Sequence, residues 1–204
     1  TPIGGEARTY YDEASLAPPS LTWAGFRLRY DWLYDYLQKP VPVRPWLPTR
    51  MPDYAFTPSE AETLVRYFAA LAGEPFPFRR HAEQPLRPEE LGDARLLFEG
   101  RQCEKCHPVS GARVAERAPD LALAAHRLNP AFVRRFLVEP QKLEPGTRMP
   151  AFFVLADDDD PDSRTTPYPE RLGGDVDRQV EALTRLTLRF ARDAAARPAR
   201  RDRP

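Results

Sequence analysis

Residues 119–140 read PDLALAAHRLNPAFVRRFLVEP, and residues 19–40 read PSLTWAGFRLRYDWLYDYLQKP. The two segments align without a gap at an offset of one hundred positions, with proline at both ends and Arg-Leu at the same place in each. After a shift of two positions, Arg-Met-Pro at 50–52 matches Arg-Met-Pro at 148–150. Since order and spacing both agree, the match indicates a duplicated domain rather than a shared proline-rich composition.

Each copy of the repeat carries the pattern of a short amphipathic helix. Apolar residues recur at 32, 33, 36 and 37 and again at 132, 133, 136 and 137, and Pro40 and Pro140 are expected to end these helices. Further helices are predicted over 89–99 and 175–192, and another starting at Thr57-Pro58. We expect the helix after Thr57 to bury Leu64, Phe68 and Leu71, and the helix over 89–99 to bury Leu91, Leu97 and Phe98.

The composition limits both the fold and the function. No pair of alternating runs joined by a hairpin turn is found, and 24 prolines exclude long unbroken helices. The predicted fold class is therefore all-α, with short helices and long Pro-rich loops. Thirty basic residues cancel thirty acidic ones, so the charge excess typical of a nucleic-acid-binding protein is missing. No apolar run approaches the length of a transmembrane segment.

The two cysteines lie in Cys103-Glu104-Lys105-Cys106-His107. This is the spacing of covalent haem attachment, because two thiols three residues apart on one turn reach the vinyl groups of one haem. The histidine that follows directs its imidazole at the iron. A zinc site and a dithiol redox pair are the alternatives. Zinc needs further ligands, for which only His81 and His126 are available as histidines, and a thioredoxin-like motif expects a βαβ setting.

Met149 is the candidate for the sixth iron ligand. It follows His107 by 42 positions, in a loop that Pro145 and Pro150 stiffen. A thioether favours ferrous iron, raises the reduction potential and closes the iron to substrates. A methionine that only fills a gap in the core, and a role for His126 as the ligand instead, are the alternatives.

Together these residues resemble a class I c-type cytochrome domain over about 88–192. The resemblance implies a few helices packed around one covalent haem c, with His107 and Met149 as axial iron ligands and the Pro119 carbonyl as acceptor for the proximal imidazole. It also implies contact of Gly92 and Phe98 with the last helix, near Phe190. Arg127 and Arg148 are candidates for pairing with the haem propionates. The residues that carry the resemblance are Gly92, Phe98, Cys103, Glu104, Lys105, Cys106, His107, Ala118, Pro119, Asp120, Leu121, Gly146, Thr147, Arg148, Met149 and Pro150.

The first half departs from the family at the attachment motif, because residues 3–7 stand where the repeat would place it, and they contain neither cysteine nor histidine. We therefore divide the chain into a degenerate cytochrome c-like domain (1–73), a Pro-rich linker (74–87), a monohaem domain (88–192) and a disordered basic tail (193–204). The first half has lost its haem and filled the space with aromatic residues, or Met51 binds a haem attached upstream of Thr1 or on another subunit. The aromatic residues in question are Tyr10, Tyr11, Trp23 and Trp46.

The predicted function is electron transfer by an extracytoplasmic tandem cytochrome c, with redox proteins as donor and acceptor. We predict no catalytic residues, no nucleic-acid partner and no transmembrane segment in this chain. We expect the protein to be a subunit or domain of a larger redox assembly, such as a respiratory complex or a homo-oligomer. The alternative is a haem enzyme of the peroxidase type, or the cytochrome domain of a larger oxidoreductase. By resemblance, attachment of this kind is made in the periplasm or on the outer face of a bacterial membrane. A removed targeting segment or a longer protein would each explain a chain that starts at Thr1.

Overall fold

The computed structural model describes residues 18, 20–47, 50–74, 86–109, 118–154 and 163–195. Within these residues the chain is helical, which confirms the predicted all-α class, and Leu28 and Leu128 form an isolated antiparallel bridge. Residues 1–17, most of the predicted linker and most of the predicted tail lie outside the described residues. No helix in the described part is both long and apolar enough to cross a membrane.

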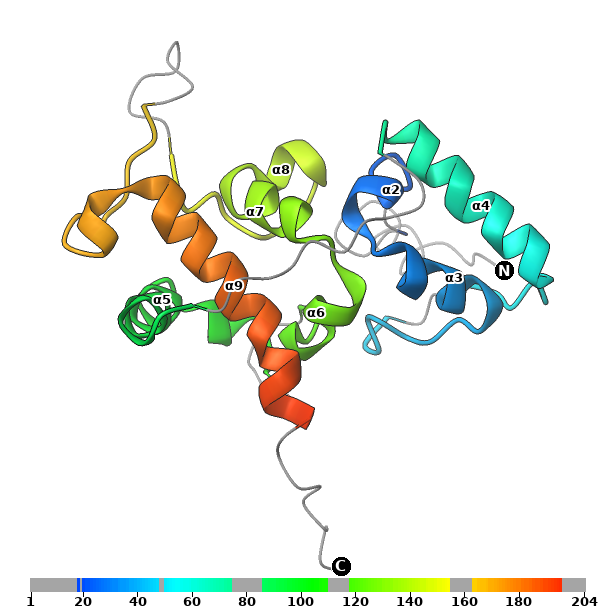
Figure 1. Cartoon of the computed structure of the whole chain (residues 1–204), viewed down its shortest axis with the longest axis horizontal. Coiled ribbons are helices and arrows are strands. Elements are labelled where there is room, and N and C mark those ends of the chain that lie inside the picture. Colours follow the sequence, from blue (N-terminus) through cyan, green and yellow to red (C-terminus); the bar gives the residue numbers. More distant parts are fainter. Residues whose placement is uncertain are drawn as a thin grey trace, which may run out of the picture.

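The first half contributes α2 (Ala24–Arg27), α3 (Tyr30–Gln38) and α4 (Pro58–Leu71), which form one lobe in Figure 1. Thr57 begins α4 with a capping box, since its hydroxyl accepts from the Glu60 amide while the Glu60 carboxylate accepts from the Thr57 amide. The core of this lobe lies between α4 and the pair α2 and α3, and it consists of Ala24, Leu28, Tyr30, Leu33, Leu37, Ala61, Val65 and Ala69.

The second half is larger and is arranged around one long helix, α9 (Val176–Ala195), against which α5 (Pro88–Gly100) packs. The short 3-10 helices η1 (Cys103–Lys105), η2 (Leu121–Leu123) and η3 (Leu172–Gly174) connect the longer elements. Between η2 and η3 lie α6 (Ala124–Arg127), α7 (Pro130–Val138) and α8 (Pro140–Leu143). The helix predicted to end near 192 continues to Ala195, and it corrects the expectation that the prolines exclude long helices, because residues 176–195 contain none.

The repeat seen in the sequence is present in the structure. Helices α2 and α6 start and end one hundred residues apart, and α3 and α7 occupy matching positions. The predicted ends of α3 and α7 hold to within two residues, but Pro140 does more than end α7. It is the first residue of α8, a position where proline fits because the first helical amides need no partner.

The buried face of α4 differs from the prediction. Ala61, Val65 and Ala69 are buried, whereas Leu64 and Phe68 are half-buried and Leu71 is 54% exposed. The reason is the close approach of α2, whose Gly25 backbone lies against the backbone of Phe68 and Ala69. Only small side chains fit where two helix backbones come this near, so the face with the smaller residues turns inward.

The expected contact between α5 and α9 is partly correct. The rings of Phe98 and Phe190 lie 5.2 Å apart between centroids. Gly92, however, is exposed, and a methyl group at that position would meet no atom within 4 Å. Ala94, one turn before Phe98, is fully buried and provides the small residue at this packing face.

The two halves are joined through their equivalent segments. The amide of Arg29 donates to the carbonyl of Arg127, and the amide of Asn129 donates to the carbonyl of Arg27, each at 2.9 Å. This reciprocal pair gives the joint an approximate internal two-fold symmetry. Leu128 packs against the cores of both halves, and Arg27 of the first half forms a 2.7 Å ion pair with Glu144 of the second.

Aromatic side chains complete the joint. The ring of Phe26 meets the edge of Phe132, with centroids 5.9 Å apart. The second half also places two arginines on tryptophans of the first half, since Arg127 and Arg135 lie 5.7 Å and 5.6 Å from the ring centroids of Trp32 and Trp23. Trp23 therefore packs at the joint between the two halves.

We expect Gly25→Ala to destabilise the protein by about 3 kcal/mol, because its new methyl carbon would lie 1.9 Å from the Phe68 carbonyl oxygen. Gly92→Ala is the matched control. It adds a methyl group to an exposed helix position with open space around it, and we expect it to stabilise by about 0.5–1 kcal/mol. Urea unfolding of both variants checks the pair, and similar effects in the two would contradict the close approach of α2 and α4.

Candidate functional site

The predicted attachment motif, Cys103–His107, forms a tight turn directly after α5. Gln102 adopts a left-handed conformation with φ of 57°, which turns the chain into η1. The amides of Cys106 and His107 then both donate to the carbonyl of Cys103, at 3.3 Å and 3.0 Å. This hydrogen bonding holds the five residues of the motif in a compact turn. Cys103 is half-buried and Cys106 is exposed.

His107 is fixed by a hydrogen bond to the chain on the other side of the site. Its Nδ1 lies 2.9 Å from the carbonyl oxygen of Pro119, so the predicted bond is present, and Nδ1 is the donor because a carbonyl oxygen only accepts. Nε2 is then the nitrogen with a free lone pair, available to a metal. Burial lowers the pKa of His107, an effect that the bond to Pro119 and the charge of Asp120 oppose.

Two further hydrogen bonds hold Pro119 in place. The amide of Leu121 donates to the carbonyl of Pro108 at 3.0 Å, which ties η2 to the residue after His107. The carboxylate of Asp120 accepts from the amide of Ala122 at 2.8 Å and caps η2. The carbonyl that orients the imidazole is thus held in place by the hydrogen bonds of the two residues that follow it.

Met149 lies at the same apolar core as the attachment turn. Both Met149 and Cys103 are partly buried and pack against the core cluster of the second half. The loop that carries Met149 is tied back to α8, since the side-chain amide of Gln141 donates to the Met149 carbonyl at 2.6 Å. The amide of Met149 donates to the Thr147 hydroxyl at 3.3 Å. Met149 and Cys103, which lie in distant parts of the sequence, therefore pack on one common core.

The other predicted residues in the described part are exposed or have their contacts elsewhere. Arg127 turns toward the first half, where it stacks on Trp32, and burial, with the nearby charge of Arg27, lowers its pKa to about 10. Arg148 is exposed beside Met149, and His126 is exposed on α6. In the first half, Met51 is half-buried against that half's core, and Trp46 is half-buried as well. His81, Tyr10 and Tyr11, and residues 3–7, lie outside the described residues.

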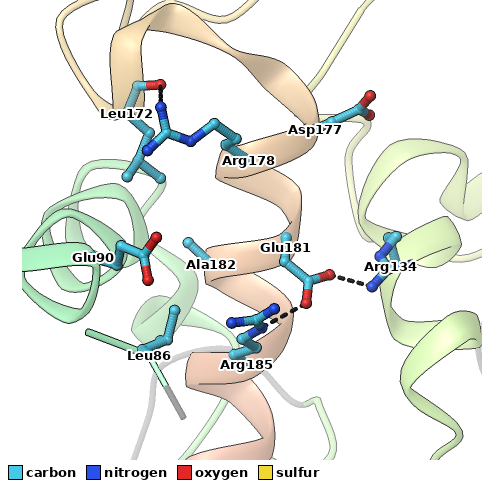
Figure 2. Close-up of a pocket in the computed structure, with 9 residues that line it drawn as sticks. All are labelled: Leu86, Glu90, Arg134, Leu172, Asp177, Arg178, Glu181, Ala182 and Arg185. Atoms are coloured by element: carbon cyan, nitrogen blue, oxygen red, sulfur yellow. Dashed lines mark hydrogen bonds and ion pairs between the residues drawn. The ribbon is translucent and has the colours of Figure 1, made fainter. Parts of the chain in front are cut away.

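A separate pocket lies on the surface formed by α5, α7 and α9 (Figure 2). In it, the Glu181 carboxylate accepts from both Arg134 and Arg185, and Arg178 donates to the Leu172 carbonyl. It contains none of the residues that the sequence analysis singled out. Nowhere in the described residues do three or more His, Cys, Asp or Glu side chains gather as a metal site.

Comparison of the chain with protein-family models, curated proteins and solved structures found no match.

The difference between the two thiols leads to a prediction for the polypeptide prepared without cofactor. Burial raises the pKa of Cys103 to about 12, so its thiolate fraction at pH 8 is very small. We expect iodoacetamide to modify Cys103 at least a hundredfold more slowly than the exposed Cys106. Because pH 8–10 lies well below the raised pKa, the rate at Cys103 should still increase about tenfold per pH unit in that range. Peptide mass spectrometry measures both rates, and equal rates would contradict the burial of Cys103.

Proposed function

We propose that this protein is an electron carrier of the c-type cytochrome kind, with two tandem cytochrome c-like domains and one covalent haem c in the second. The observation that carries the proposal is the 2.9 Å hydrogen bond from His107 to the Pro119 carbonyl. It fixes the imidazole with Nε2 available as a ligand, in the residue directly after the second cysteine of the attachment spacing. A haem supplies reversible one-electron chemistry at its iron.

The residues at the site fit such a group. Cys103 and Cys106 would hold it by thioether bonds, since η1 keeps both within a single turn. His107 would bind one side of the iron. Met149, which packs on the same core as Cys103, would bind the other and so keep substrates from the metal. The apolar residues of this core exclude water from the site, which limits the solvent reorganisation that accompanies a change of charge.

The first half supports the haem domain in this proposal rather than carrying a second haem. Its joint to the second half is made of reciprocal backbone hydrogen bonds, an ion pair and stacked aromatic rings. Because these contacts fix the first half to the second, the first half would position the haem domain in a larger assembly. With formal charge balanced at +0, association with redox partners would depend only weakly on salt. We place the protein on the extracytoplasmic side of a bacterial membrane.

The decisive experiment is the haem content of the purified protein after expression with a cytochrome c maturation system. Intact mass and a pyridine haemochrome assay on one sample should both give one covalent haem per chain, with a low-spin spectrum. The double variant Cys103→Ser/Cys106→Ser should carry none. Two haems would make the first half a haem domain, a five-coordinate high-spin spectrum would favour the peroxidase-like alternative, and no haem in the wild type would refute the proposal.

A further inference from the structure

Arg101 is an unusual residue of the site that the sequence patterns did not single out. It stands directly after α5 and two residues before Cys103. Its guanidinium group lies 5.4, 5.1 and 5.3 Å from the ring centroids of Phe152, Phe153 and Tyr168. Two of these rings come directly after the Met149 loop, and the third comes from the segment before α9. One cation therefore connects the attachment turn with the chain that carries the distal methionine.

The hydrogen bonding of this guanidinium is incomplete. Its Nε and one of its terminal nitrogens are buried and have no hydrogen-bond acceptor. Within the described residues no carboxylate forms an ion pair with Arg101, and burial lowers its pKa. Three aromatic faces offset part of this desolvation through cation–π attraction, but they leave the N–H groups without acceptors. A neutral, apolar side chain would fill this place without the desolvation free energy of a buried guanidinium, so the positive charge calls for an electrostatic explanation.

We propose that Arg101 is a positioning residue for the haem, which holds the Met149 loop against the attachment turn and places a fixed positive charge beside the iron site. This inference rests on the proposed function. The two effects act in the same direction. When one electron from a donor protein converts ferric to ferrous haem, the site loses one positive charge, and a nearby cation stabilises the reduced form. A methionine held firmly at the iron also favours the reduced form.

Three variants separate the charge from the stacking. Arg101→Gln removes both and should lower the ratio of reduced to oxidised haem at a fixed potential about tenfold, which corresponds to about 59 mV for one electron. It should also weaken the far-red absorption band that reports methionine sulfur on ferric iron, and raise the affinity for added imidazole. Arg101→Lys keeps the charge without the planar stacking, so it should retain most of the potential while methionine is displaced more easily. Arg95→Gln removes an exposed positive charge from α5, the helix just before Arg101, and is the matched control.

The measurements are made on haem-loaded wild type and variants: spectroelectrochemical titration, the far-red band and imidazole binding. A lower potential in Arg101→Gln, with Arg95→Gln near the wild type, supports the proposal. Should Arg101→Gln fail to accumulate with haem, Arg101→Lys decides. Retained potential with easier loss of methionine supports the proposal, and wild-type behaviour in both respects overturns it. A haem-loaded wild type whose potential and methionine band are insensitive to Arg101→Gln overturns this inference alone. A wild type without haem overturns it together with the proposed function.

Discussion

In the proposed haem-loaded protein, replacing Met149 by Ala should open one side of the iron and lower the reduction potential by on the order of 0.1–0.3 V, because axial ligands set much of the roughly 0.8 V range of protein haems. Covalent attachment through Cys103 and Cys106 should survive, so the haem content stays the same. The ferric spectrum should change from low-spin to high-spin, and azide or imidazole should bind at the opened position. Absorption spectra and a potentiometric titration measure these changes.

Met51→Ala is the matched control for that experiment. Met51 stands in the same Arg-Met-Pro sequence one repeat earlier, and it is half-buried against the core of its own half as Met149 is against the other. We expect its removal to leave the spectrum and the potential unchanged. If Met51→Ala altered the haem spectrum, Met51 would be a ligand and the first half a haem site. An unaltered spectrum in Met149→Ala would assign the sixth ligand to another residue.

The second large effect is expected at the joint between the halves. Arg27 and Glu144 form an ion pair in which the side chains are only 9% and 25% exposed. Glu144→Gln removes the carboxylate and leaves the buried guanidinium with a weaker, neutral partner. Since Glu144 keeps some contact with water, we expect a loss of about 2–3 kcal/mol, at the lower end for a buried pair. With an m-value of roughly 2–3 kcal/mol/M, the urea midpoint should fall by about 1 M.

Two optical probes report the halves separately in this experiment. The three tryptophans, Trp23, Trp32 and Trp46, all belong to the first half, whereas the absorbance of the proposed haem would report the second. In the wild type both signals should change at one urea concentration, because the joint makes the halves one cooperative unit. In Glu144→Gln the tryptophan signal should change first. Glu62→Gln breaks an exposed pair with Arg66 and should shift stability by less than about 0.5 kcal/mol. Separate transitions already in the wild type would contradict a stabilising joint.

Much of the fold could be predicted because its signals are local. The capping box at Thr57 marks the start of α4, and the apolar stripes at 32–37 and 132–137 mark α3 and α7. The offset of one hundred between the copies also predicted which elements correspond. Local periodicity did not identify the buried face of α4, because apolar residues occur on both of its sides. The Gly25 backbone, which is far away in sequence, decides which side packs inward.

The same distinction holds for the site. The spacing of Cys103, Cys106 and His107 is read from five consecutive residues. Met149 was singled out by its loop between Pro145 and Pro150, and the role of Pro119 follows from the resemblance to the cytochrome family. Arg101 gave no signal, because its aromatic neighbours come from positions 152, 153 and 168 and meet it only in the folded chain. Arg127, in contrast, was evident in the sequence because it recurs in the repeat. Its contact with Trp32 could not be predicted, because it depends on how the two halves pack.

The reciprocal hydrogen bonds between Arg29 and Arg127 and between Asn129 and Arg27 use only amide and carbonyl groups of the main chain. Any residue except proline can supply such an amide, and every residue supplies the carbonyl. After duplication, therefore, side chains in one copy could change without breaking this part of the connection to the other. With a joint of this type, the second half can keep the five residues Cys103–His107 while the side chains of the first half change. The two halves still remain connected as one protein.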